Sequence, residues 1–164
     1  KRQFDHFKTM PDKINMRSLF EDVQHLYQAA AEEKGIKIIC KGDCDILIYT
    51  DPEIMKIALR NLVSNAVKFS SEGDTITVRV QKQRYTILIS VIDTGIGMTN
   101  EQLNQLFDIN VKKRTQGTSG EIGSGIGLSF TADLLGKISA KLRAESKPGH
   151  GSTFTIVLNK EFVQ

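Results

Sequence analysis

The sequence of 164 residues predicts an α+β fold in which a mixed sheet carries helices on one face. Apolar residues recur every three or four positions in some segments and every second position in others, so both helices and strands are expected. The expected elements follow the order α-β-β-α-β-β-α-loop-α-β-β, and a chain of this length normally forms a single domain.

The first part of the chain predicts a polar lead segment, a helix and a short strand. Residues 1–13 are polar and are interpreted as a linker. A stripe of apolar residues predicts a helix over about 15–33, with Asn15 as a candidate N-cap and Gly35 as a natural stop. A short strand is expected over 36–40.

A second helix is predicted to begin at Asp51 and Pro52, after another short strand over 46–49. Asp is a favoured N-cap, and Pro suits the first helical position because its missing N–H would have no partner there. This helix is expected to run to about Phe69. The remaining expected elements are strands over 75–83 and 86–92, helices over 100–106 and 126–135, and strands over 137–145 and 152–158.

Charge and hydropathy exclude several classes of protein. The 22 basic and 19 acidic residues leave a net charge of +3, which is too balanced to predict a nucleic-acid surface. No apolar run approaches the ~20 residues that a membrane span needs, and no signal-peptide pattern opens the chain. The chain is therefore expected to make no membrane contact and to be cytoplasmic. Because it begins without Met, it is interpreted as a fragment of a longer protein.

The chain has two cysteines, Cys40 and Cys44, and no histidine lies close enough in the sequence to complete a zinc site. In a reducing cytoplasm both are expected to remain buried or idle thiols. A disulfide between them is the alternative.

One face of the helix ending near residue 69 carries polar residues suited to a nucleotide. Asn61, Asn65 and Lys68 are four and three positions apart, so they share that face. The two amide oxygens could serve a Mg²⁺ ion that keeps some waters and bridges phosphates, and the lysine could contact a phosphate. The alternative interpretation is a pair of capping asparagines beside an exposed lysine.

A second motif, DTGIG over residues 93–97, follows a predicted strand. The Asp93 carboxylate could accept a hydrogen bond from an exocyclic amine such as that of adenine. Gly95 and Gly97 would let the backbone approach closely and turn sharply. An ordinary Asp-Gly turn is the alternative.

A third motif, GSGIGL over residues 123–128, leads into a helix. Backbone N–H groups at a glycine-rich helix start can bind an anion, although neither a Rossmann nor a P-loop pattern is present. A flexible hinge is equally compatible with these glycines. Three basic residues upstream could reach a phosphate or could simply be solvated: Lys112, Lys113 and Arg114.

Together these motifs closely resemble the ATP-binding catalytic domain of sensor histidine kinases, in a superfamily shared with gyrase, a heat-shock chaperone and mismatch-repair ATPases. The N box of that family resembles NLxxNAxKF, which residues 61–69 match in full. Its two glycine boxes, DxGxG and GxGxGL, match 93–97 and 123–128, and its final strand motif, GxGSTF, matches 149–154. The resemblance covers about residues 14–160.

The resemblance implies an α/β sandwich of the Bergerat type. In it a mixed, mostly antiparallel sheet is covered on one face by helices, and ATP lies between helices and a mobile lid. The domain would span 14–164, with the lid at about 107–124. The residues implied at the nucleotide are Asn61, Asn65, Lys68, Phe69, Asp93, Gly95, Ile96, Gly97, Gly123, Gly125, Gly127, Leu128 and Thr153.

The resemblance also implies the role of each group. Asn65 would hold Mg²⁺, with Asn61 assisting at the phosphates, and Lys68 would contact a phosphate. Asp93 would bind the adenine amine, with Thr153 supporting it through water. The implied activity is transfer of the γ-phosphate of Mg-ATP to a histidine. Hydrolysis as the main activity is disfavoured, because hydrolysing relatives carry a glutamate at the position of Asn61.

Two departures from the family pattern bear on partners. The aromatic motif before the lid retains only Phe107, so the family pattern does not predict how the lid packs. None of His6, His25 and His150 is followed by an acidic residue, so no phosphoacceptor box is present. The acceptor histidine is therefore expected on a dimerisation domain of the same protein, and the phosphoryl group is expected to pass to the aspartate of a response regulator receiver domain. The fragment is expected to be a monomer and the full, membrane-anchored kinase a homodimer.

Overall fold

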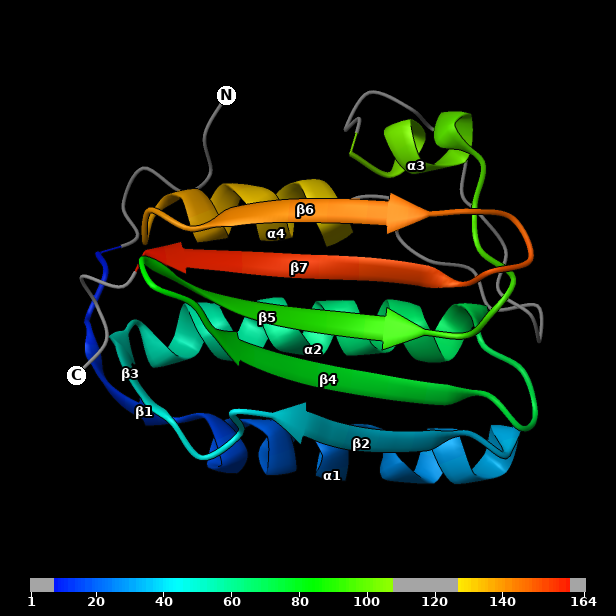
Figure 1. Cartoon of the computed structure of the whole chain (residues 1–164), viewed down its shortest axis with the longest axis horizontal. Coiled ribbons are helices and arrows are strands. Elements are labelled where there is room, and N and C mark those ends of the chain that lie inside the picture. Colours follow the sequence, from blue (N-terminus) through cyan, green and yellow to red (C-terminus); the bar gives the residue numbers. More distant parts are fainter. Residues whose placement is uncertain (1–7, 108–126, 160–164) are drawn as a thin grey trace.

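The computed structural model describes residues 8–107 and 127–159, which form a sheet with helices packed on one face (Figure 1). The strand order is β2-β4-β5-β7-β6, and a separate two-stranded sheet pairs β1 with β3. The helices are α1 (Met16–Lys34), α2 (Pro52–Phe69), α3 (Asn100–Phe107) and α4 (Gly127–Gly136). The strands are β1 (Asp12–Asn15), β2 (Lys37–Gly42), β3 (Leu47–Thr50), β4 (Thr75–Lys82), β5 (Thr86–Asp93), β6 (Lys141–Ser146) and β7 (Ser152–Asn159).

The predicted mixed, mostly antiparallel sheet is confirmed. β2 runs parallel to β4, whereas β4, β5, β7 and β6 pair in antiparallel fashion. In Figure 1 the strands lie in front and α1, α2 and α4 lie behind them. One face of each strand therefore packs against the helices, and alternate residues such as Ile87, Ile89 and Val91 of β5 are fully buried there.

Both long helices begin and end as their sequences predict. The side chain of Asn15 accepts a hydrogen bond from the backbone N–H of Ser18, and Gly35 ends α1 in the left-handed conformation. The buried Asp51 carboxylate accepts from the first turn of α2 and, through its other oxygen, from the backbone N–H of Met10. Asp51 therefore caps α2 and also ties the chain preceding β1 to it.

The sequence-based element order is wrong at the start, because it omits β1. This strand overlaps the segment interpreted as a linker, and Ile14 is its only buried residue. The predicted strand over 46–49 is β3, which pairs with β1 and not with the main sheet. A polar four-residue strand has too little alternation to be recognised without its partner.

Two further expectations are corrected. Cys40 and Cys44 form a disulfide and are not free thiols. The turn at Gly42, where the N–H of Cys44 donates to the Gly42 carbonyl, brings the two side chains together. β6 begins four residues later than expected, because α4 is followed by a turn in which the N–H of Ala140 donates to the carbonyl of Leu135.

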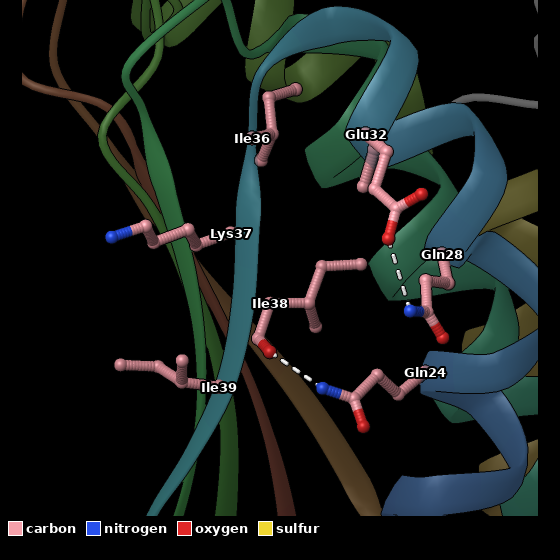
Figure 2. A pocket seen from close by; sticks show the side chains of 8 residues that line it. Gln24, Gln28, Glu32, Ile36, Lys37, Ile38 and Ile39 are labelled. Atoms are coloured by element: carbon pink, nitrogen blue, oxygen red, sulfur yellow. Dashed lines mark hydrogen bonds between the residues drawn. The ribbon is translucent and has the colours of Figure 1, made fainter.

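The outer edge of the sheet is partly covered by side chains of α1 (Figure 2). Here a hollow of about 280 Å³ lies between α1 and β2. Ile36 and Ile38 point into it, and the side chain of Gln24 donates a hydrogen bond of 2.8 Å to the carbonyl of Ile38. This bond occupies a carbonyl at the exposed edge of β2 and so protects the edge from pairing with another strand. In the part of the chain that the structure describes, no helix is long and apolar enough to cross a membrane.

Candidate functional site

The polar residues of the N box lie on the half-buried side of α2. Asn61, Asn65 and Lys68 are all partly exposed, whereas the side of α2 that carries Leu59 and Leu62 is fully buried. The helix is thus held by its apolar side and presents the two amides and the lysine along one edge. The predicted sharing of one face by these three residues is confirmed.

Asn61 is also tied to α4. Its side-chain nitrogen donates a hydrogen bond of 3.0 Å to the hydroxyl of Thr131, and this hydroxyl donates one of 2.6 Å to the carbonyl of Gly127. The N box is therefore linked to Gly127, the residue of the second glycine box with which α4 begins. Thr131 was not singled out from the sequence, since a threonine inside a helix gives no signal of its own.

The end of α2 is anchored by a lysine of α1. The ammonium of Lys34 donates to the carbonyls of Val67 and Lys68 at 2.9 and 3.2 Å, which caps the last turn of α2. The ammonium of Lys68 lies 4.9 Å from the ring centroid of Phe69. Phe69 is buried, and its carbonyl accepts from the N–H of Ile96, so the N box directly contacts the first glycine box.

Asp93 stands at the end of β5 and is 4% exposed. Its Oδ1 atom accepts from the backbone N–H groups of Gly95 and Ser152, at 3.0 and 3.2 Å. Among the described residues none donates to Oδ2. Burial raises the pKa of the Asp93 carboxyl to about 6, against the opposing effect of the two backbone hydrogen bonds. The group is thus an ionised acceptor at neutral pH and is partly protonated near pH 6.

The glycines of the first glycine box are required by close backbone approaches. A Cβ atom at Gly95 would clash with the carbonyl oxygen of Phe69. At Gly97 the backbone adopts φ +67°, and a Cβ atom there would clash with the carbonyl oxygen of Lys147. Any side chain at these two positions would push the loop away from α2 or from the β6–β7 turn. Ile96, between them, is 49% exposed and so is available to a ligand.

The structure does not place Thr153 beside the Asp93 carboxylate. Thr153 pairs with Ile92, on the face of the sheet that the helices leave open. Ser152 pairs with Asp93 and lies on the helix side, so it is the hydroxyl residue nearest to this carboxylate in the register. In the sequence, Ser152 could have been identified as the residue that directly follows Gly151.

A serine pair holds the first glycine box against the last hairpin. The hydroxyl of Ser146 lies 2.7 Å from the hydroxyl of Ser152. It accepts a hydrogen bond of 2.8 Å from the N–H of Met98 and donates one of 3.0 Å to the carbonyl of Gly151. The loop after β5 is therefore connected to both β6 and β7. Ser146, too, was missed in the sequence, because it lies in an ordinary polar strand end.

The second glycine box is described only in part. Gly127 is the first residue of α4, and space beside its Cα is open. Leu128 is 2% exposed and packs in the core, so its side chain supports the site from within and does not line it. Gly123, Gly125, residues 112–114 and the lid beyond Phe107 lie outside the described residues.

The oxygen atoms of this site suit a hard cation whose remaining coordination positions are filled by a bound ligand and by water. The described residues contain no group of three or more His, Cys, Asp or Glu side chains that could hold a metal by themselves. Asn61 and Asn65 supply neutral carbonyl oxygens, which Mg²⁺ accepts when waters and phosphate oxygens complete its shell. Neutral oxygens also avoid the repulsion that carboxylates would exert on phosphates.

Comparison with known proteins identifies relatives that are named sensor proteins and that match nearly the whole chain. A family model described as histidine kinase-, DNA gyrase B- and HSP90-like ATPase matches residues 50–161. The chain is 32% identical to the sensor protein EvgS of Escherichia coli O157:H7 over 97% of its length. It is 33% identical over 96% of its length to the virulence sensor protein BvgS of Bordetella bronchiseptica. It spans only 14% and 13% of those two proteins.

Solved structures share the fold. The catalytic domain of histidine kinase ThkA superposes with a TM-score of 0.77 at 22% identity, covering 92% of this chain and 98% of that domain. Full-length ShkA in complex with AMPPNP superposes with a TM-score of 0.79 at 23% identity, covering 93% of this chain and 31% of ShkA. At such identities the likeness concerns the fold.

Proposed function

The chain belongs to the histidine kinase-, DNA gyrase B- and HSP90-like ATPase family, and we propose that it is the catalytic domain of a two-component sensor kinase, which binds Mg-ATP and transfers the γ-phosphate to a histidine. The proposal rests above all on the buried Asp93 carboxylate, whose Oδ1 is held by two backbone N–H groups. Its Oδ2 is left to accept from the adenine amine. Guanine carries a carbonyl at that position, which the carboxylate would repel, so adenine is preferred.

The phosphates would lie between α2 and the start of α4. Asn65 would bind Mg²⁺, Asn61 would assist at the phosphates, and Lys68 would contribute a positive charge. Backbone N–H groups near the start of α4, at Gly127 and Leu128, would favour an anion. Gly123 and Gly125 would extend this rim.

Catalysis by this chain would consist of positioning. Phosphoryl transfer needs alignment and charge stabilisation more than covalent help from the protein. The acceptor histidine would belong to a dimerisation domain of the same protein, and a response regulator receiver domain would then take the phosphoryl group. This chemistry uses ATP, so we place the domain in the cytoplasm.

Calorimetric titration of the chain with ATP, with and without Mg²⁺, and with GTP as control tests the proposal. We expect micromolar binding that prefers ATP over GTP and changes with Mg²⁺. Phosphoryl transfer is then tested by adding the dimerisation domain of a relative, with its acceptor histidine, together with [γ-³²P]ATP. We expect that domain to become labelled, and the label to be labile in acid and stable in base. Equal affinity for GTP, or no binding at all, would contradict the assigned base pocket.

A further inference from the structure

Thr131 is a buried polar residue between two helices, and none of the motifs includes it. It lies on α4, is 0% exposed, and its hydroxyl contacts only two polar groups among the described residues. These are the side-chain nitrogen of Asn61 at 3.0 Å and the carbonyl of Gly127 at 2.6 Å. The hydroxyl thus lies between a predicted phosphate-site residue and the first residue of α4.

Because the Thr131 hydroxyl has a single proton, it determines which end of the Asn61 amide, the NH₂ group or the oxygen, faces α4. A hydroxyl has one proton to donate. An oxygen–oxygen distance of 2.6 Å to the carbonyl of Gly127 requires that proton between the two atoms, since a carbonyl cannot donate. Towards Asn61 the hydroxyl of Thr131 can then only accept. The end of the amide that faces α4 must therefore be the NH₂ group, because the carbonyl end would place two acceptors in contact.

We propose that Thr131 is a positioning residue that acts through Asn61 and keeps the carbonyl oxygen of this amide turned away from the Thr131 hydroxyl, so that the oxygen is available to a cation. This inference rests on the proposed function. A carbonyl oxygen attracts a cation or the protons of a metal-bound water, whereas the NH₂ group would attract a phosphate oxygen. Thr131 therefore selects the orientation in which Asn61 assists at the phosphates through its carbonyl oxygen, by way of the metal or a metal-bound water, over the one in which its NH₂ group would contact a phosphate directly.

The Thr131→Val variant tests the inference, because it removes the hydroxyl and conserves the volume. The quantity to measure is the ratio of ATP affinities with and without Mg²⁺, determined by calorimetry. We expect this ratio to fall about fivefold, the effect of one ordinary hydrogen bond, as the amide becomes free to turn. Affinity for ATP without Mg²⁺ should stay the same or rise. Thr131→Ser, which keeps the hydroxyl, should restore the wild-type ratio.

A double-mutant cycle separates positioning from packing. If Thr131 acts through Asn61, adding Thr131→Val to Asn61→Ala should leave the Mg²⁺ ratio unchanged. An unchanged ratio in Thr131→Val alone would overturn the inference, and so would an equal loss with and without Mg²⁺ that serine does not rescue. If the wild-type chain binds no ATP, the proposed function itself fails, so the two failures are distinguishable.

A measurement on the wild-type chain covers the case in which Thr131→Val does not fold. The side-chain NH₂ signals of Asn61 can be assigned in an NMR spectrum by their absence from Asn61→Ala. Because the NH₂ group is held by Thr131, we expect ATP without Mg²⁺ to shift these signals only slightly. A large shift under that condition would mean that the NH₂ group faces the phosphates, and would overturn the inference.

Discussion

The two ends of the proposed nucleotide site are held by different kinds of contact. At the base end, Asp93 and the loop after it are fixed by backbone groups of Gly95, Phe69 and Ser152. At the phosphate end, α2 and α4 are joined by a side-chain hydrogen bond between Asn61 and Thr131. A backbone contact survives most substitutions and resists movement, whereas a side-chain contact can rearrange. The base end is therefore suited to selecting one ligand, and the phosphate end to adjusting around it.

The largest expected effect comes from Gly95→Ala at the base end. A methyl group there would clash with the carbonyl of Phe69, so either the loop or the end of α2 must move. We expect a loss of stability of about 1–3 kcal/mol and loss of measurable ATP binding, followed by thermal unfolding and calorimetry. Gly136→Ala is the matched control, since space beside Gly136 is open and its φ is not positive. Wild-type affinity in Gly95→Ala would show that the base end is adjustable after all.

Asp93→Asn should abolish most of the affinity for ATP and leave the fold intact. The amide oxygen can still accept from Gly95 and Ser152, but an NH₂ group replaces the acceptor that the adenine amine needs. A charged hydrogen bond of this kind corresponds to a loss of about 10- to 100-fold, which calorimetry measures. Asp22→Asn, an exposed change on α1, controls for the lost charge. Retained affinity would mean that the base lies elsewhere.

The pH dependence should run in opposite directions for binding and for stability. The pKa of the Asp93 carboxyl is raised to about 6 by burial, so ATP affinity should fall as the pH drops below about 6 and the acceptor is protonated. Because the folded-state pKa lies above the unfolded one, the contribution of this group to stability is present near pH 4 and is lost as the pH rises through 6. Melting temperatures and affinities from pH 4 to 8 test both trends, and Asp93→Asn should remove both.

The smallest expected effect comes from Lys34→Met, which removes the cap on α2. Loss of the hydrogen bonds to the carbonyls of Val67 and Lys68 should cost about 1 kcal/mol, or roughly 2–4 °C in melting temperature. ATP affinity should fall by less than in Asp93→Asn, since the backbone contact of Phe69 with Ile96 remains. Lys41→Met, at an exposed position of β2, is the control. If Lys34→Met reduced the free energy of ATP binding more than the free energy of unfolding, Lys34 would take a direct part in the site.

Much of the fold was predictable because its signals are local. The caps at Asn15 and Asp51, the stop at Gly35 and the alternation in β4 and β5 depend on residues a few positions apart. Local signals also identified the N box and the glycine boxes. Shifted boundaries, such as the late start of β6, reflect a turn whose hydrogen bonds follow the helix and leave no periodic pattern.

Two of the expectations that failed depended on contacts distant in sequence. β1 is a strand only because β3 pairs with it, and the choice between Ser152 and Thr153 depends on the register of β7 against β5. The disulfide between Cys40 and Cys44 is an exception, because its two cysteines are only four positions apart and it depends on the local path of the backbone through Gly42. For β1 and for Ser152 the deciding partner strand lies outside the window that periodicity or spacing can sample.

The sequence by itself determined the family and the α+β class, and it supplied the residue types of the proposed nucleotide site, because these depend on side-chain chemistry and on spacing along single elements. Only the tertiary structure decided how those residues are held. It placed Lys34 at the end of α2, Ser152 beside Asp93 and the hydroxyl of Thr131 beneath Asn61. The physical reason is that hydrogen-bond partners are chosen by proximity in space, and α1, α2, α4 and β7 meet only once the helices pack on the sheet.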